Sequence, residues 1–356
     1  MPESRWFHRS LPLLACVLLV ACSSATPPAP TPAAQAPAAP GAAAEPTRPP
    51  ALTPLTVGYG AVTGVYIPLW LALDQGYFEK HGLAVELVHL PGNTGPQSLI
   101  AGQVPVMGLS GFAAAPSMIE GADLVVISMA ANRMTAQVYS VPAVDAPPAL
   151  RGKRMGITRP GTLTYFAALL ALRDWGLRPD QDVALVSFNE VPSILGGMLE
   201  GAADAGILTE PTAFQADAEG LRLLADLADS PTEYLTSGMT TTHAYAQQNR
   251  SVLLSLLEGY AEGTRRYFDD RPTALETLKK YARIDDPAIL DKTYALYAEK
   301  YLLKNPLPSV AAMQNILDDY AEVNPKARDV DASKLVDPSF VQELQREGFL
   351  HALGLE

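Results

Sequence analysis

Apolar and polar positions follow two different periods along the first two thirds of the chain. In residues 76–111, Gly76 ends an apolar helical run, and Leu83, Val85 and Leu87 then alternate with other residues as in a half-buried strand. This block continues with a turn at residues 91–95, a short helix at 97–101 and a buried strand at 104–109. The order of strand, helix and strand predicts a parallel βα unit.

The βα pattern extends to about residue 227, and helices follow. We predict further strands at residues 55–58, 123–129, 138–141, 151–157 (with its turn), 183–187, 205–208 and 221–227. We predict helices at residues 68–75, 112–120, 165–175, 193–200, 212–219, 244–268 with a break near Asn249, 273–283, 287–303, 310–320 and 339–353, with an extended segment at 330–336. Leu253, Leu257 and Tyr260 show the spacing of a helix with one apolar face.

The amino-terminal residues have the features of a lipoprotein leader. Arg5 and Arg9 precede an apolar run at residues 11–20, which is too short to span a membrane as a mature helix. The run ends in Leu-Val-Ala followed by Cys22, which resembles a lipobox. We therefore expect a signal peptide at residues 1–21, a lipidated Cys22, and an attachment to the outer face of the cytoplasmic membrane, in the periplasm or at the cell surface.

Composition narrows the classes of function further. Residues 23–51 are 20 Ala or Pro out of 29, which predicts an extended tether rather than a core. The formal net charge of −12 argues against a nucleic-acid partner. Cys16 and Cys22 are the only cysteines, so the predicted folded body has no disulfide, no thiolate metal site and no cysteine nucleophile.

Several short motifs recur in order along the chain: Gly-Tyr-Phe at residues 76–78, Gly82-Leu83, the glycine-rich loop after it, Gly152-Lys153, Asp204-Ala205 and the segment 336–349. With these motifs the chain resembles the NMT1/THI5-like and sulfonate, nitrate and taurine type solute-binding proteins of ABC importers. This resemblance implies an α/β fold of the periplasmic-binding-protein type II class, with two βα lobes, a hinge and a helical carboxyl-terminal extension. We expect lobe I at residues 52–140 plus 240–356, lobe II at 141–239, and residues 22–51 as the lipidated cysteine and tether.

The resemblance also implies a role. The protein would be a monomer that captures a small organic solute by hinge closure. The solute would belong either to the sulfonate, nitrate and taurine class or to a pyrimidine-like class. It would deliver that solute to the permease and ATPase subunits of an ABC importer, without a cofactor and without chemistry on the solute.

Ligands of open parallel sheets bind at the carboxyl ends of the strands. The residues in such loops are the candidate solute contacts: Tyr59, Thr63, Gly64, Val65, Asn93, Ser110, Gly111, Arg133, Thr162, Thr164, Tyr165, Glu190 and Glu210. Arg133 and the helix start at Thr162 favour an anionic group. Glu190 and Glu210 favour a ligand with N–H donors or positive charge. The sequence leaves the charge of the solute open.

Two other functions have weaker sequence support. The same family includes enzymes that make the thiamin pyrimidine, but these carry a cysteine-rich metal motif that the predicted body lacks. Phe112 stands where a Gly-x-Ser-x-Gly nucleophile motif needs its last glycine, and no metal-binding histidine motif is present in the sequence. The other alternative is a sensing module that presents its bound ligand to a membrane receptor.

Overall fold

The computed structural model describes residues 51–91 and 94–356. The expected signal peptide, Cys22, nearly all of the tether and Asn93 lie outside this part of the chain. Within the described residues, no helix combines the length and the apolar composition needed to cross a membrane.

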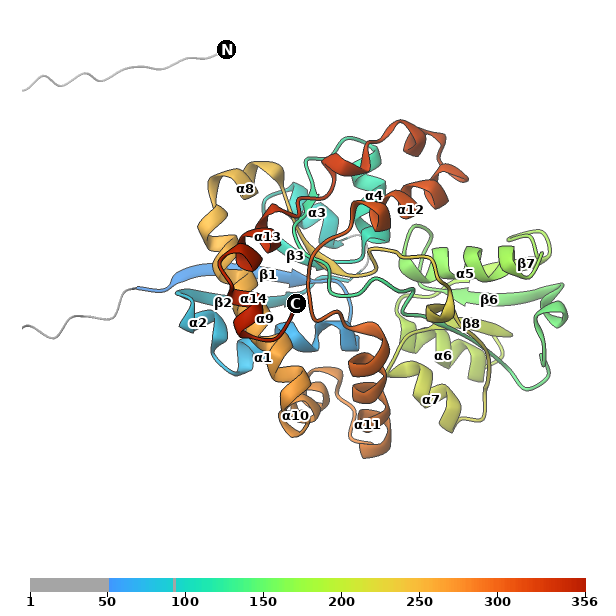
Figure 1. Ribbon diagram of the computed structural model, residues 1–356. Coiled ribbons are helices and arrows are strands. Elements are labelled where there is room, and N and C mark those ends of the chain that lie inside the picture. Colours follow the sequence, from blue (N-terminus) through green and yellow to red (C-terminus); the bar gives the residue numbers. More distant parts are fainter. Residues whose placement is uncertain (1–50, 92–93) are drawn as a thin grey trace, which may run out of the picture. The chain divides into compact units, whose positions relative to one another are not determined.

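The first of two five-stranded sheets is built mainly from the amino-terminal part of the body (Figure 1). Its strands run in the order β2-β1-β3-β10-β4. The bounds are β1 Thr53–Tyr59, β2 Leu83–His89, β3 Val106–Leu109, β4 Val125–Val126 and β10 Gly238–Thr241. Strand β1 pairs in parallel with β2 and β3, whereas β10 is antiparallel to β3 and β4. We call the part built on this sheet the first lobe.

The helices of the first lobe come from both ends of the body. The amino-terminal ones are η1 Gly64–Tyr66, α1 Ile67–Asp74, α2 Tyr77–Lys80, α3 Thr94–Ile100 and α4 Gly111–Ile119. The carboxyl-terminal ones are α8 His243–Gln248, α9 Arg250–Asp269, α10 Arg271–Ala282, α11 Pro287–Leu296, the π-helical turn η4 Tyr297–Tyr301, α12 Val310–Ala321, η5 Pro325–Asp329, η6 Ala332–Lys334, α13 Ser339–Arg346 and α14 Phe349–Ala352. Helix α9 contacts α1, α2, α10 and α13, so it is central to this layer.

The second sheet comes from the middle of the chain and defines the second lobe. Its order is β7-β6-β8-β5-β9, with β6 parallel to β7 and β8, and β5 antiparallel to β8 and β9. The bounds are β5 Gln137–Ser140, η2 Pro147–Leu150, β6 Lys153–Ile157, α5 Leu163–Asp174, β7 Val183–Ser187, α6 Val191–Leu199, β8 Ala205–Leu208, α7 Thr212–Ala218, β9 Arg222–Asp226 and η3 Leu227–Asp229. Helices α5 and α6 both contact β6 and β8.

The sequence predicted a two-lobed α/β fold of the periplasmic-binding-protein type, and the two sheets confirm that class. Strand β5 lies inside segment 52–140, which we expected to belong to lobe I, yet it pairs with the second sheet. All four of its residues are buried, so no polar face in its sequence indicates which sheet it joins.

Several predicted elements differ from the structure in length or type. The expected strand at residues 123–129 is β4, only two residues long, because the Met239 amide of β10 donates to the Ser128 hydroxyl oxygen rather than to a backbone carbonyl, and the Met129 amide turns to the Pro306 carbonyl oxygen. Segment 330–336 contains the helical turn η6 rather than an extended strand. The last predicted helix is divided at Gly348, whose φ of 74° does not fit a continuous helix.

The two lobes meet through aromatic side chains beside the joining segments. The rings of Phe112 on α4 and Phe166 on α5 stack with centroids 5.0 Å apart. Tyr320 on α12 donates hydrogen bonds from its hydroxyl to the carbonyl oxygens of Phe112 (2.8 Å) and Gly161 (3.0 Å). Helix α12 is therefore bonded to one residue from each lobe.

Candidate functional site

A cavity of about 330 Å³ lies where the strand ends of the two sheets face each other. The first lobe contributes the loops after β1, β2 and β3, and the second lobe contributes the loops after β6, β7 and β8. Thr135, Thr236 and Ser237, from the segments that join the lobes, and residues 282–284, at the end of α10, complete the lining. The volume falls within the range of small-molecule sites.

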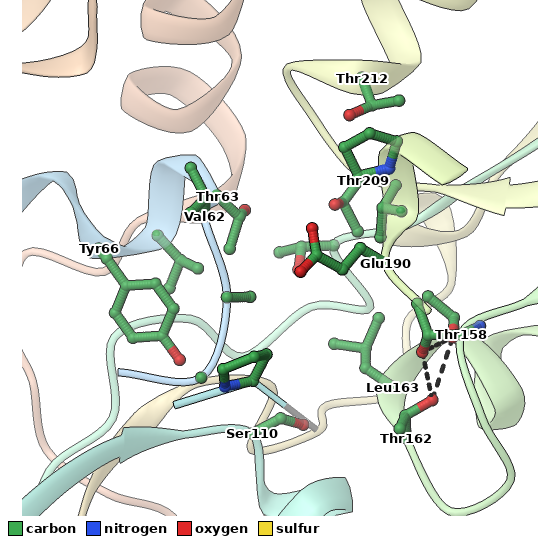
Figure 2. Close-up of a pocket in the computed structure, with 18 of the residues that line it drawn as sticks. Val62, Thr63, Tyr66, Ser110, Thr158, Thr162, Leu163, Glu190, Thr209 and Thr212 are labelled. Carbon is green, nitrogen blue, oxygen red and sulfur yellow. Dashed lines mark hydrogen bonds between the residues drawn. The ribbon is translucent and has the colours of Figure 1, made fainter. Parts of the chain in front are cut away.

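The second-lobe wall is rich in hydroxyl groups. Thr158 follows β6, and its hydroxyl oxygen lies 2.9 Å from that of Thr162 and 2.7 Å from that of Thr164 (Figure 2). The Thr158 amide donates to the Thr164 hydroxyl oxygen at 2.9 Å, and the Thr162 hydroxyl donates to the carbonyl oxygen of Arg159 at 2.7 Å. These bonds fix the turn that leads from β6 into α5.

Several helices begin at the cavity. Ser110, Thr162 and Glu190 are the N-cap residues of α4, α5 and α6, and all three line it. The Ser110 hydroxyl accepts from the amide of Phe112 at 3.2 Å, whereas the side chains of Thr162 and Glu190 cap no first-turn amide. The amino ends of α5 and α6 therefore place backbone donors and a partial positive charge near this wall.

The first-lobe wall is mostly apolar. Val62, Val65, Leu109 and Ile284 line this side, and Figure 2 shows Val62 and Thr63 across the cavity from Thr209 and Thr212. Tyr66 uses its hydroxyl to donate to the Gly108 carbonyl oxygen at 2.9 Å, so this group is already occupied. The second-lobe wall thus consists largely of hydrogen-bonding groups, whereas the first-lobe wall combines apolar side chains with Thr63, Ser110, His89 and Arg283.

Four side chains of the His, Arg and Glu types line the cavity: His89, Arg159, Glu190 and Arg283. Arg159 has a buried Nε with no hydrogen-bond partner among the described residues. Burial lowers the pKa of His89, and the negative charge of Glu190 opposes that shift. A lowered pKa favours the neutral form of the His89 imidazole. The other charge-bearing side chains of the lining are Arg159, Arg283 and Glu190.

Six of the predicted site residues line the cavity: Thr63, Val65, Ser110, Thr162, Thr164 and Glu190. Six others do not: Tyr59, Gly64, Gly111, Arg133, Tyr165 and Glu210. Asn93, the remaining candidate, is outside the described residues.

The residues off the lining have structural contacts instead. Tyr59 stacks on His89, with ring centroids 5.1 Å apart, and Tyr165 packs edge-on against Phe166. Arg133 donates to the carbonyl oxygen of Ser230 at 3.0 Å. Glu210 is fully buried.

Gly64 and Gly111 are placed by close packing. A Cβ at Gly64 would lie 2.4 Å from the Tyr297 ring, and one at Gly111 would lie 2.8 Å from the Leu235 carbonyl oxygen. Both positions therefore require a residue without a side chain.

Sequence reasoning missed Arg159 and most of the hydroxyl lining. Arg159 is in the loop after β6, the same loop that supplied Thr162 and Thr164, so the rule of strand ends applies to it. Thr209 and Thr212 flank Glu210, which was chosen for its charge. Thr135, Thr236 and Ser237 are in joining segments, which that rule does not cover.

Comparison with solved structures places this fold among known ones. The alkanesulfonate-binding protein SsuA from Xanthomonas axonopodis pv. citri, bound to MOPS, is 17% identical with a TM-score of 0.68, over 81% of this chain and 99% of that one. The aliphatic sulphonate-binding protein SsuA from Escherichia coli is 20% identical with a TM-score of 0.67, over 80% and 92%. The nitrate-binding protein NrtA from Synechocystis PCC 6803 is 12% identical with a TM-score of 0.69, over 83% and 89%. All three are named as binding proteins, the last two as periplasmic ones, and this chain has their two-lobed fold.

The sequence also matches a family model. Residues 63–274 match the model described as NMT1/THI5 like, so the chain belongs to that family. A search of curated proteins finds no match.

Proposed function

We propose that the protein is the extracytoplasmic solute-binding component of an ABC importer. It captures a small organic solute between its two lobes and delivers it to a permease, without changing the solute chemically. The observation that carries this proposal is the cavity, whose walls come from the strand ends of both sheets. A solute touching both walls stabilises the arrangement in which the lobes are together. The family and the sulfonate and nitrate receptors of the same fold support this role.

The polarity of the cavity favours one kind of solute. The second-lobe wall offers the Arg159 guanidinium, threonine hydroxyls and the amino ends of α5 and α6. Such donors suit an acceptor-rich head group such as a sulfonate or a carboxylate. The opposite wall of Val62, Val65 and Ile284 suits an aliphatic body. We therefore favour an organic anion over a pyrimidine-like solute.

A thermal-shift panel on the full chain tests this proposal. The panel contains alkanesulfonates, taurine, alkyl carboxylates, nitrate, formylaminopyrimidines and simple amines. An alkanesulfonate or carboxylate at about 100 times its Kd should add about 2.7 kcal/mol to the free energy of unfolding. A response to pyrimidines or amines alone would overturn the anionic head group. Conversion of a bound compound into a product would overturn the non-enzymatic role.

We also propose that Cys22 carries the lipid anchor and that the segment after it connects the body to the membrane. The proposal rests on the Leu-Val-Ala-Cys sequence at residues 19–22 and the Ala/Pro-rich residues that follow. The test compares Cys22→Ala with Cys16→Ala, a cysteine within the expected leader. Cys22→Ala should release the protein from the membrane fraction, whereas Cys16→Ala should leave it attached. Membrane retention of Cys22→Ala would contradict lipidation at this residue.

A further inference from the structure

Glu210 is a buried carboxyl directly behind the cavity wall. It stands between Thr209 and Pro211, which both line the cavity, and its side chain has no solvent exposure. Its Oε1 lies 3.4 Å from the Tyr301 hydroxyl, and its Oε2 has no hydrogen-bond partner among the described residues. An ionised carboxylate in this position lacks the partners that stabilise a buried charge.

The cover over Glu210 comes from the other lobe. Tyr297 and Tyr301, at the two ends of the turn η4, are almost completely buried in the hydrophobic cluster that contains α1 and α9 of the first lobe. Their rings pack edge to face, with centroids 5.1 Å apart. Glu210 itself follows β8 of the second lobe. Separation of the lobes at η4 would therefore admit water to this carboxyl.

The charged and titratable groups around Glu210 come from three elements besides its own. Asp226 ends β9, Lys300 lies on η4 beside the two tyrosines, and Tyr139 on β5 faces Glu210 and Asp226. The Tyr139 hydroxyl donates to Asp217 of α7 at 2.9 Å.

Lys300 does not neutralise Glu210 through a contact of its own. Its Nζ donates to Asp226 at 2.6 Å and to Asp229 at 2.7 Å, so its charge is committed to two aspartates. Burial, together with the negative charge of Asp226, raises the pKa of Glu210 to about 8. The neutral carboxylic acid is thus the form that fits the arrangement in which η4 covers it.

We propose that Glu210 is a positioning residue that takes up a proton when the lobes close over the cavity and releases it when they open. This inference rests on the proposed function, in which closure of the lobes traps the solute. It makes closure, and with it solute retention, stronger in acidic than in alkaline surroundings. The coupling follows because only the open arrangement hydrates the carboxylate.

The test measures the distance between the lobes in the solute-free full chain. Spin labels at Ile100→Cys of the first lobe and Leu199→Cys of the second, both exposed positions, report this distance when Cys16 and Cys22 are replaced by serine. Between about pH 5 and about pH 8, the ratio of open to closed molecules should rise by up to about tenfold per pH unit, because the hydrated carboxyl of the open form ionises near its ordinary pKa of 4.5, whereas the closed form keeps its proton up to about pH 8. Above about pH 8 the ratio should level off.

Two variants separate this role from a merely structural one. Glu210→Gln keeps the shape and cannot ionise, so its distance distribution should stay closed at both pH values. Asp226→Asn removes a charge that raises the pKa of Glu210 in the closed arrangement, so the opening should level off at a lower pH and reach a smaller extent than in the parent protein.

The proposal is overturned if the parent chain keeps one distance distribution over this pH range, or if Glu210→Gln opens as the parent does. Because no solute is used, these results are independent of the thermal-shift panel. A silent panel would count against the proposed function alone.

Discussion

The hydroxyl oxygens of Tyr297 and Thr63 lie 2.7 Å apart, although 234 residues separate them in the sequence. Thr63 lines the cavity, and Tyr297 lies on the turn that covers Glu210. The carboxyl-terminal helices therefore contact the cavity wall directly, through a buried hydrogen bond. This bond links the cavity wall with the turn that buries the second-lobe carboxyl.

The Thr63–Tyr297 bond should appear in a double-mutant cycle. Tyr297→Phe and Thr63→Val each remove one hydroxyl, and the pair should show a coupling of about 1 kcal/mol in the free energy of unfolding, because each single change leaves a buried partner unsatisfied. Urea denaturation of the four proteins measures it. Tyr245→Phe is the control, since this hydroxyl has no hydrogen bond within the described part of the chain. A coupling near zero would show that the two hydroxyls do not stabilise each other.

A substitution in α9 should disturb the helical layer of the first lobe. A Cβ at Gly263 would lie 2.2 Å from the Pro68 carbonyl oxygen, and backbone cannot move aside as a side chain can. Gly263→Ala should therefore destabilise the protein by about 3 kcal/mol, at the upper end for overpacking. Gly196→Ala in α6 meets no atom within 4 Å and should instead stabilise by about 0.5–1 kcal/mol. Equal effects of the two changes would contradict the close approach of α9 and α1.

The two arginines near strand ends should differ in their effect on binding. Arg159→Gln removes a cavity guanidinium and should weaken the binding of an anionic solute by about tenfold or more, which corresponds to about 1.4 kcal/mol. Arg133→Gln is the matched control, because Arg133 bonds to Ser230 away from the lining, and its affinity should change less than about twofold. Isothermal titration with an alkanesulfonate measures both. A larger loss in Arg133→Gln would mean that the solute binds elsewhere.

Asp204 should contribute stability at neutral pH and lose it in acid. It accepts from the Arg154 amide at 2.9 Å and from the Arg154 Nε at 3.1 Å. Burial acts to raise the pKa of Asp204, but the hydrogen bonds from Arg154 overcome this and hold it below its ordinary value. Because the folded pKa lies below the unfolded one, this stability is present above the unfolded pKa, near 3.8, and disappears as pH falls through the folded pKa.

Asp204→Asn should accordingly cost about 1–2 kcal/mol at neutral pH, and its stability curve should meet that of the parent in acid. Asp285→Asn provides the comparison, since Asp285 is largely exposed and its pair with Lys279 should contribute less than about 1 kcal/mol. Denaturation across the acid range measures both variants. Parallel curves for Asp204→Asn and the parent at all pH values would contradict the linkage.

The pattern of apolar residues predicted most elements of the second lobe because each is short and bounded by turn residues. Strands β7 and β8 have the predicted bounds, and α7 differs by one residue at its end. Sheet membership was harder to predict, as β5 shows: a strand buried on both faces has no polar side to orient it. Pairing of such a strand depends on the whole fold.

The strand-end rule identified the loops of the site but not every side chain in them. Thr162 and Thr164 line the cavity together with Arg159, and both Arg159 and Arg133 follow predicted strands, so their positions in the sequence do not distinguish them. The direction of a long side chain depends on partners that are distant in sequence, such as the Ser230 carbonyl that binds Arg133. Glu210 is a sequence candidate because of its negative charge, but burial raises its pKa and so disfavours the charged form.

The order of the strands determines which sheet can be completed first as the chain emerges from its amino terminus. All strands of the second sheet lie between residues 137 and 226, whereas the first sheet needs β10, at Gly238–Thr241, to join β3 with β4. The middle of the chain can therefore complete its sheet while the earlier strands still await their last neighbour. Helix α9, which covers α1, is made later still. Strands β1 to β4 therefore gain their last sheet neighbour and the helix that covers α1 only after every strand of the second sheet is available.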